Sequence, residues 1–181
     1  MKIGIVSDHA GFAEKAKIML IIQKLVQEYE QLKGIEFEDY GPHALNPLDD
    51  YPDFSKLLAG KILNKECEKG IAVCGTGIGM SMDLNKVPGI RAALCYSEAA
   101  AKKAASHNNA NVICLRGDLD EKDMERIIFT WLTTPFDISG ANSRHLRRLR
   151  KMERGEGQYL WRRSMIRVKS YFHRENWGPQ K

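Results

Sequence analysis

The chain has 181 residues, of which 43% are hydrophobic and 28% charged, as expected for a globular domain with a sizeable core. The net charge of +5 comes wholly from residues 151–181, which carry 8 basic and 3 acidic residues, whereas residues 1–150 carry 20 of each. Composition therefore excludes a strongly basic main domain of the kind that binds nucleic acid, and no apolar stretch suits a membrane span or signal peptide, so we expect a cytoplasmic protein.

The predicted elements alternate between strands and helices. Apolar runs predict strands at 2–7, 35–40, 70–74, 91–96 and 111–115. Helical periodicity predicts helices at 12–33, 53–64, about 78–86, 98–106 and 120–133, and from Arg144 past Met152. Most strands are continuously apolar, which is typical of a parallel sheet covered on both faces.

This order predicts an α/β fold. We expect a doubly wound, Rossmann-like or flavodoxin-like domain over residues 1–150, with five parallel strands and helices on both faces. Residues 151–181 are predicted to form a basic C-terminal extension, helical or partly disordered. Ligands of such sheets bind outside the carboxyl ends of the strands, where Asp8, Cys74 and Tyr96 are expected to lie.

The stretch after the third predicted strand is the strongest chemical signal. The strand ends at Cys74, and glycines follow at positions 75, 77 and 79. Bare backbone N–H groups can surround an anion, and a thiol beside a helix start is expected to have a lowered pKa. A phosphatase loop would need arginine where Met80 stands, and the G-x-G-x-G spacing does not match the dinucleotide fingerprint.

Other polar residues mark further candidate sites, each with a plainer alternative. Asp8 and His9 follow the first strand and suit sugar binding or proton transfer, although Asp8 could simply cap a helix. His107 ends an alanine-rich helix, where a histidine also favours the helix dipole. Arg144 and Arg148 share one helix face and suit a phosphate, or form an ordinary solvated face.

The remaining cysteines indicate no metal or disulfide framework. The four cysteines form no C-x-x-C pair, and Cys95 and Cys114 lie in apolar strand-like runs where thiols act as small hydrophobes. A reducing compartment and the absence of a structural zinc site are expected.

Five segments in order carry a resemblance to a known family. They are SDHAGF near the start, DYPDF at 50–54, CGTGIGMSMDLNKVPGIRAA at 74–93, SHNNANVICL at 106–115 and SRHLRR at 143–148. Together they resemble the type B ribose-5-phosphate isomerases and the related galactose-6-phosphate isomerase subunits, over roughly residues 1–150.

The resemblance implies a role for each matching residue. Cys74 would be the base that moves a proton between C2 and C1 of the open-chain sugar, Thr76 would assist it, and His107 would open the furanose ring. The implied binding residues are Asp8, His9, Tyr51 and Asn108 for sugar oxygens, Gly75, Gly77 and Gly79 for the enediolate, and Arg144 and Arg148 for phosphate. No metal or organic cofactor is implied, and the assembly would be a homodimer or homotetramer with shared sites.

Several alternatives stay open at this stage. Asp118 stands where the family commonly carries a phosphate-binding arginine, so either Arg116 replaces it or the phosphate is held less firmly. D-ribose 5-phosphate and D-ribulose 5-phosphate are the expected substrates, with a hexose 6-phosphate of the allose or galactose type as the alternative. A non-catalytic sugar-phosphate-binding protein is a further alternative, with the basic extension contacting nucleic acid or a partner; Cys74, Thr76 and His107 argue against it.

Overall fold

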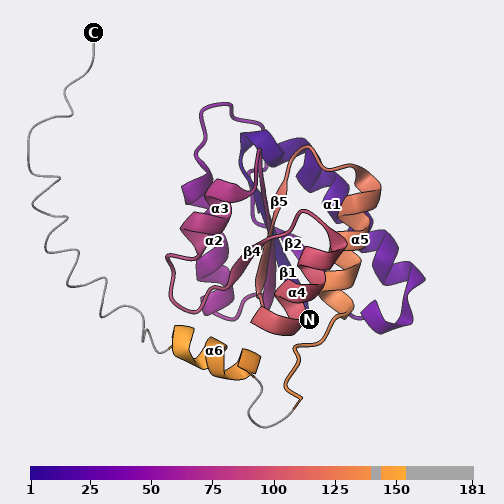
Figure 1. Cartoon of the computed structure of the whole chain (residues 1–181). Coiled ribbons are helices and arrows are strands. Elements are labelled where there is room, and N and C mark those ends of the chain that lie inside the picture. Colours follow the sequence, from indigo (N-terminus) through magenta and orange to yellow (C-terminus); the bar gives the residue numbers. More distant parts are fainter. Residues whose placement is uncertain (140–143, 154–181) are drawn as a thin grey trace, which may run out of the picture. The chain divides into compact units, whose positions relative to one another are not determined.

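The computed structural model describes residues 1–139 and 144–153. The chain divides into one unit at Met1–Ile138 and a second at Ser139–Lys181, and each is considered by itself. The first unit is a parallel sheet between two layers of helices (Figure 1). The predicted basic extension therefore lies outside the described residues from position 154 onward.

Five strands form the sheet, and every pairing between neighbours is parallel. The order is β2-β1-β3-β5-β4, with β1 and β3 near the centre. The strands are β1 (Lys2–Ser7), β2 (Glu36–Asp39), β3 (Lys69–Cys74), β4 (Ala92–Leu94) and β5 (Val112–Arg116). The predicted doubly wound α/β sheet with five parallel strands is confirmed.

The helices connect the strands and cover both faces of the sheet. Their bounds are α1 (Phe12–Glu28), α2 (Tyr51–Leu63), α3 (Ile78–Leu84), α4 (Glu98–Asn108), α5 (Glu121–Thr133) and, in the second unit, α6 (Arg144–Glu153). Short 3-10 turns occur at η1 (His9–Gly11) and η2 (Glu30–Leu32). None of the helices in the described parts of the chain has the length and apolar character of a bilayer span.

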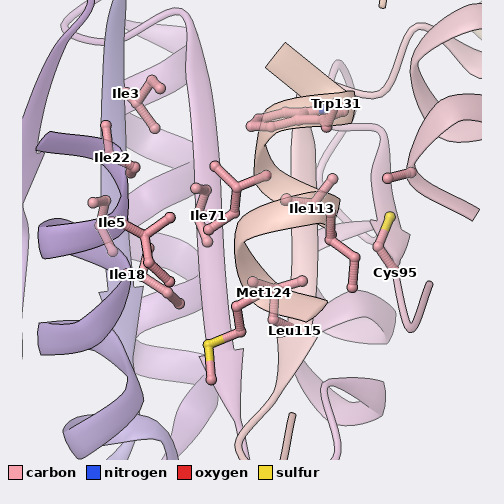
Figure 2. Close-up of a cluster of buried hydrophobic side chains, with 14 of the residues drawn as sticks. Ile3, Ile5, Ile18, Ile22, Ile71, Cys95, Ile113, Leu115, Met124 and Trp131 are labelled. Atoms are coloured by element: carbon pink, nitrogen blue, oxygen red, sulfur yellow. The ribbon is translucent and has the colours of Figure 1, made fainter. Parts of the chain in front are cut away.

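Alternating side chains of the strands pack into two separate hydrophobic cores, one on each face of the sheet. On one face, Ile3, Ile5 and Ile71 pack with residues of α1, α4 and α5, including the fully buried Trp131 (Figure 2). On the other face, Val6 and Ala72 pack with residues of α2 and α3. Burial on both faces explains why the strands are continuously apolar in sequence.

Three local features show how sequence sets the element ends. The helix predicted over 12–33 ends at Glu28, because Tyr29 is extended (φ −117°, ψ 116°) and its ring lies 4.5 Å from that of Phe129. The α2 helix begins at Tyr51, two residues before the predicted start, with Pro52 in its first turn. Ser97 caps α4, accepting the Ala100 N–H at 3.2 Å.

Candidate functional site

The carboxyl edge of the sheet gathers the polar residues that end the central strands. Cys74 is the last residue of β3 and pairs in register with Arg116, the last residue of β5. Asp8 directly follows β1, and its backbone N–H donates to the Val73 carbonyl at 3.2 Å. Parallel strands end at one edge, so residues distant in sequence meet here.

The Cys74 thiol lies beneath the turn that opens α3. The Gly77 N–H donates to Cys74 Sγ at 3.1 Å. Gly77 has φ +72°, and a Cβ there would lie 2.6 Å from Leu94 Cδ1 and 3.0 Å from the Leu115 carbonyl oxygen. Only glycine fits both the backbone angle and the space, so this residue brings an N–H donor to the sulfur. The thiol is 4% exposed, less open in the single chain than the glycine-rich sequence suggests.

The neighbouring residues of the loop are more accessible. Gly75 and Thr76 are exposed, and Thr76 Oγ1 accepts the Ile78 N–H at 3.3 Å. Accepting this bond leaves the Thr76 hydroxyl hydrogen able to donate. A Cβ at Gly75 would make only an ordinary contact, 3.5 Å from Ala10 Cβ, so its surroundings in one chain do not demand glycine.

Tyr51 joins this group through a close contact with Gly79. A Cβ at Gly79 would lie 2.8 Å from Tyr51 Cζ, so the glycine lets the ring pack against the first turn of α3. Tyr51 is the first residue of α2, and its side chain remains partly exposed at 37%. The structure thus brings Tyr51, Gly79 and the cysteine loop together.

Asp8 and His9 have different environments although they are adjacent. Asp8 is 5% exposed, its Oδ1 accepts the Gly11 N–H at 3.0 Å, and burial raises the pKa of its carboxyl. The capping role considered for Asp8 is therefore present. His9 is not merely exposed, because its ring Nδ1 lies 2.8 Å from Asp49 Oδ1, and this hydrogen bond raises the pKa of His9. No pattern in the sequence indicates the contact between His9 and Asp49.

The loop that leads from β2 to Tyr51 is held by a buried lysine that sequence reasoning also missed. The Lys15 ammonium lies 2.6 and 2.8 Å from the two Asp39 carboxylate oxygens and also donates to the Pro42 carbonyl. Asp39 Oδ1 in turn accepts the Gly41 N–H at 2.8 Å. Lys15 is 2% exposed, so a charge on the inner side of α1 fixes the start of the loop.

The other three cysteines are buried away from this turn. Burial raises the pKa of Cys67, raises that of Cys95 to about 12, and raises that of Cys114 well above its ordinary value. Their thiols are therefore protonated at neutral pH and act as small apolar side chains, as predicted for Cys95 and Cys114.

His107 and Asn108 lie at the opposite edge of the sheet. They end α4, whose following residues lead into the start of β5; there the Asn111 carbonyl accepts the Gly70 N–H at 2.8 Å. A pocket at this amino edge is lined by Lys69, Asn109, Leu132 and Phe136, among others. One strand length, roughly 15 Å, separates His107 from the level of Cys74, so one chain does not bring them together.

The arginines expected to bind phosphate lie in both units of the chain. Arg116, at the carboxyl edge, makes a two-pronged ion pair with Asp118 and thereby lowers the pKa of that carboxyl. Arg144 and Arg148 are exposed and lie one turn apart on α6, which belongs to the second unit. In residues 1–139 and 144–153, no three His, Cys, Asp or Glu side chains are grouped as metal ligands.

Comparison with known proteins identifies the family of this chain. A model of the ribose/galactose isomerase family matches residues 3–152. The chain belongs to the ribose/galactose isomerase family. This member is 38% identical over 154 residues to a Mycoplasma genitalium protein named probable ribose-5-phosphate isomerase B, a match that covers 84% of this chain and 93% of that one.

Solved structures of the family agree in fold. A crystal structure of a ribose 5-phosphate isomerase from Thermotoga maritima is 44% identical with a TM-score of 0.73, covering 84% of this chain and 97% of that one. A ribose-5-phosphate isomerase B from Mycoplasma genitalium, with bound ribulose 5-phosphate, is 37% identical with a TM-score of 0.73, covering 87% and 97%. The chain is thus a member of a sugar-phosphate isomerase family over nearly its whole described length.

Proposed function

We propose that this family member interconverts D-ribose 5-phosphate and D-ribulose 5-phosphate, with Cys74 as the base. The observation that carries the proposal is the Cys74 thiol at the carboxyl edge, 3.1 Å from the Gly77 N–H and next to the exposed Gly75–Thr76 turn. The relatives named ribose-5-phosphate isomerase, one of them holding ribulose 5-phosphate, support this choice of sugar.

The reaction requires one base and a cradle for negative charge. As a thiolate, Cys74 takes the proton from C2 of the open-chain aldose, which leaves an enediolate with its negative charge on O1. The hydroxyl proton of O2 passes to O1, and the thiol returns its proton to C1 to give the ketose. Backbone N–H groups of the Gly75–Gly79 turn stabilise the enediolate oxygen, and each such donor is worth about 3 kcal/mol in well-formed oxyanion sites. Thr76 donates to the reacting oxygen or to the sulfur.

Two groups of residues bind the sugar phosphate: one at the carboxyl edge of the sheet and one on α6. Asp8, His9 and Tyr51 hold sugar hydroxyls beside Cys74. Arg144 and Arg148, one turn apart, grip the phosphate with charge-assisted hydrogen bonds. Arg116, the other candidate for the phosphate, is paired with Asp118 and would have to leave it to bind an anion.

His107 acts in a site other than that of its own chain. The roughly 15 Å between the two edges of the sheet exceeds any hydrogen-bond distance. We therefore assign the His107 and Asn108 of one copy to the Cys74 site of a second copy, which makes the active assembly a homodimer or a homotetramer of such dimers. His107 would open the furanose ring there.

A hexose 6-phosphate is the second candidate substrate. The family description covers both ribose and galactose isomerases, so the fold serves sugars of different length. Purified protein is to be given ribose 5-phosphate and allose 6-phosphate in parallel, with Cys74→Ala as the control. Faster turnover of ribose 5-phosphate by wild type, lost in the variant, is expected. No turnover of either sugar would exclude the isomerase function, and undiminished turnover by Cys74→Ala would exclude the role of Cys74.

A further inference from the structure

The His9 imidazole is bound by a residue forty positions away, in the loop that precedes α2. Asp49 Oδ1 accepts the His9 backbone N–H at 2.8 Å and also lies 2.8 Å from His9 Nδ1. The Asp49 carbonyl oxygen lies 3.1 Å from the same ring nitrogen. Asp49 stands just before the DYPDF segment, so the family motif does not account for it.

These contacts determine which ring nitrogen carries the hydrogen. A backbone carbonyl oxygen can only accept, and so can an ionised carboxylate. Both groups face Nδ1, so Nδ1 carries a hydrogen whether the ring is neutral or charged. Nε2 is then the nitrogen that gains and loses a proton, and only the imidazolium has an Nε2–H to donate.

The charges around His9 favour that imidazolium. The hydrogen bond to Asp49 is the main reason that the His9 pKa is raised, and the negative charge of the neighbouring Asp8 raises it further. The His9 side chain is 40% exposed, and Nε2 lies on the side of the ring away from Asp49. A ligand at the carboxyl edge can therefore meet a charged donor.

The Asp49 carboxylate is itself unusual. Its side chain is only 9% exposed, yet among the described residues Oδ2 has no hydrogen-bond partner. A carboxylate kept only for loop structure would be expected to have both oxygens satisfied when buried to this extent. Its burial therefore has a better explanation in what it does to His9.

We propose that Asp49 is the positioning residue for His9, which it fixes in the Nδ1–H form so that the imidazolium donates from Nε2 to an oxygen of the bound sugar phosphate. The inference rests on the proposed function for the identity of the ligand. The inference has a structural half, the tautomer and the charge of His9, which can be measured in the free protein. Its functional half is the hydrogen bond that His9 donates to the ligand. The donor exists only below the His9 pKa, so kcat/KM falls as the pH rises through it.

The structural half is tested by NMR on the full chain with 15N-labelled histidine, using His9→Gln to assign the signals. Nδ1 should stay protonated while Nε2 titrates, with a midpoint above that of an ordinary histidine. In Asp49→Asn, which keeps the shape and removes the charge, the midpoint should fall. Asp53→Asn, which removes a nearby exposed charge, should leave it in place. A neutral His9 protonated on Nε2, or a midpoint equal in wild type and Asp49→Asn, would overturn the proposal.

The functional half is tested by pH profiles of kcat/KM with ribose 5-phosphate. Asp49→Asn should move the alkaline limb to lower pH by the same amount as the NMR midpoint, and Asp49→Glu should restore part of the shift. On that limb we expect about a tenfold loss, the worth of one charge-assisted hydrogen bond. If the NMR midpoint moves while the alkaline limb of the kcat/KM profile stays in place, the donor role of His9 is wrong. Absence of turnover in wild type would instead refute the proposed function and leave the NMR result standing.

Discussion

The two edges of the sheet differ in what they offer to a ligand. At the carboxyl edge, Tyr51 and Cys74 lie against a glycine turn whose Gly77 N–H donates to the thiol, and Asp8 follows the neighbouring strand. At the amino edge, His107 and Asn108 end α4 beside a pocket that contains Lys69. Under the proposed function each edge has part of the chemistry that sugar isomerisation requires, so one chain would present two incomplete halves of a site.

The largest expected effect distinguishes the Cys74 thiol at the carboxyl edge from the fully buried thiol of Cys114 in β5. Cys74→Ala should lower kcat by about 10³-fold, because a general base is typically worth 10² to 10⁴. Cys114→Ala should retain most of its kcat and lose about 1–2 kcal/mol of stability through a small cavity. Initial rates and urea unfolding measure the two; similar losses of kcat would remove the distinction between the thiols.

Mixing two inactive variants tests whether the edges of different copies combine. Cys74→Ala and His107→Ala should each be nearly inactive alone. After unfolding and refolding together, random C2 dimers should recover about a quarter of the wild-type sites, because half the dimers are mixed and each has one intact site. Mixing without refolding is the control. Full independence of the copies would give no recovery at all.

Within the carboxyl edge, two glycines should differ in their tolerance of a side chain. Gly77→Ala should cost about 2–3 kcal/mol of stability, because it combines a positive φ with contacts of 2.6 and 3.0 Å. Gly75→Ala is the matched variant and should cost far less, since its Cβ meets only an ordinary contact at 3.5 Å. Urea unfolding of both variants checks the order. Equal costs would show that the turn relaxes around Gly77.

The smallest effect concerns Asp8, whose carboxyl pKa is raised by burial. Above that raised pKa the ionised form disfavours the folded state, so Asp8→Asn should be more stable by about 1 kcal/mol near neutral pH, and should still accept the Gly11 N–H. The gain should shrink as the pH falls through the folded-state pKa. Unfolding at about pH 7 and about pH 4 measures it. A gain that is independent of pH would not come from ionisation.

The sequence was sufficient to predict the architecture. Continuous apolar runs such as Ile71–Val73 and the alternation with helices predicted the parallel sheet, because they reflect burial that is local in sequence. The ends of elements were less accurate: the strand expected over 91–96 is only Ala92–Leu94, an edge strand that pairs with β5 alone. Strand order is a tertiary property and was not predicted.

The site was predicted unevenly for a similar reason. Cys74 and its glycines form one continuous motif, so their proximity follows from the sequence. The contact of Asp49 with His9, and that of Lys15 with Asp39, join residues 40 and 24 positions apart, and depend on a loop path that no local pattern encodes. The placement of His107 and Cys74 at opposite edges likewise could be predicted only by knowing the direction in which α4 runs along the sheet.

The loop between β2 and α2 has a consequence for how the ligand is received. It is tied at its start by the Lys15 ammonium on Asp39 and Pro42, and at its end by Asp49 on His9. The conformational entropy of this segment is therefore lost when the chain folds and not when the sugar phosphate arrives. Replacing Lys15 would transfer that ordering to the binding step, so weaker affinity would appear as a more unfavourable binding entropy while the contacts to the ligand stay the same.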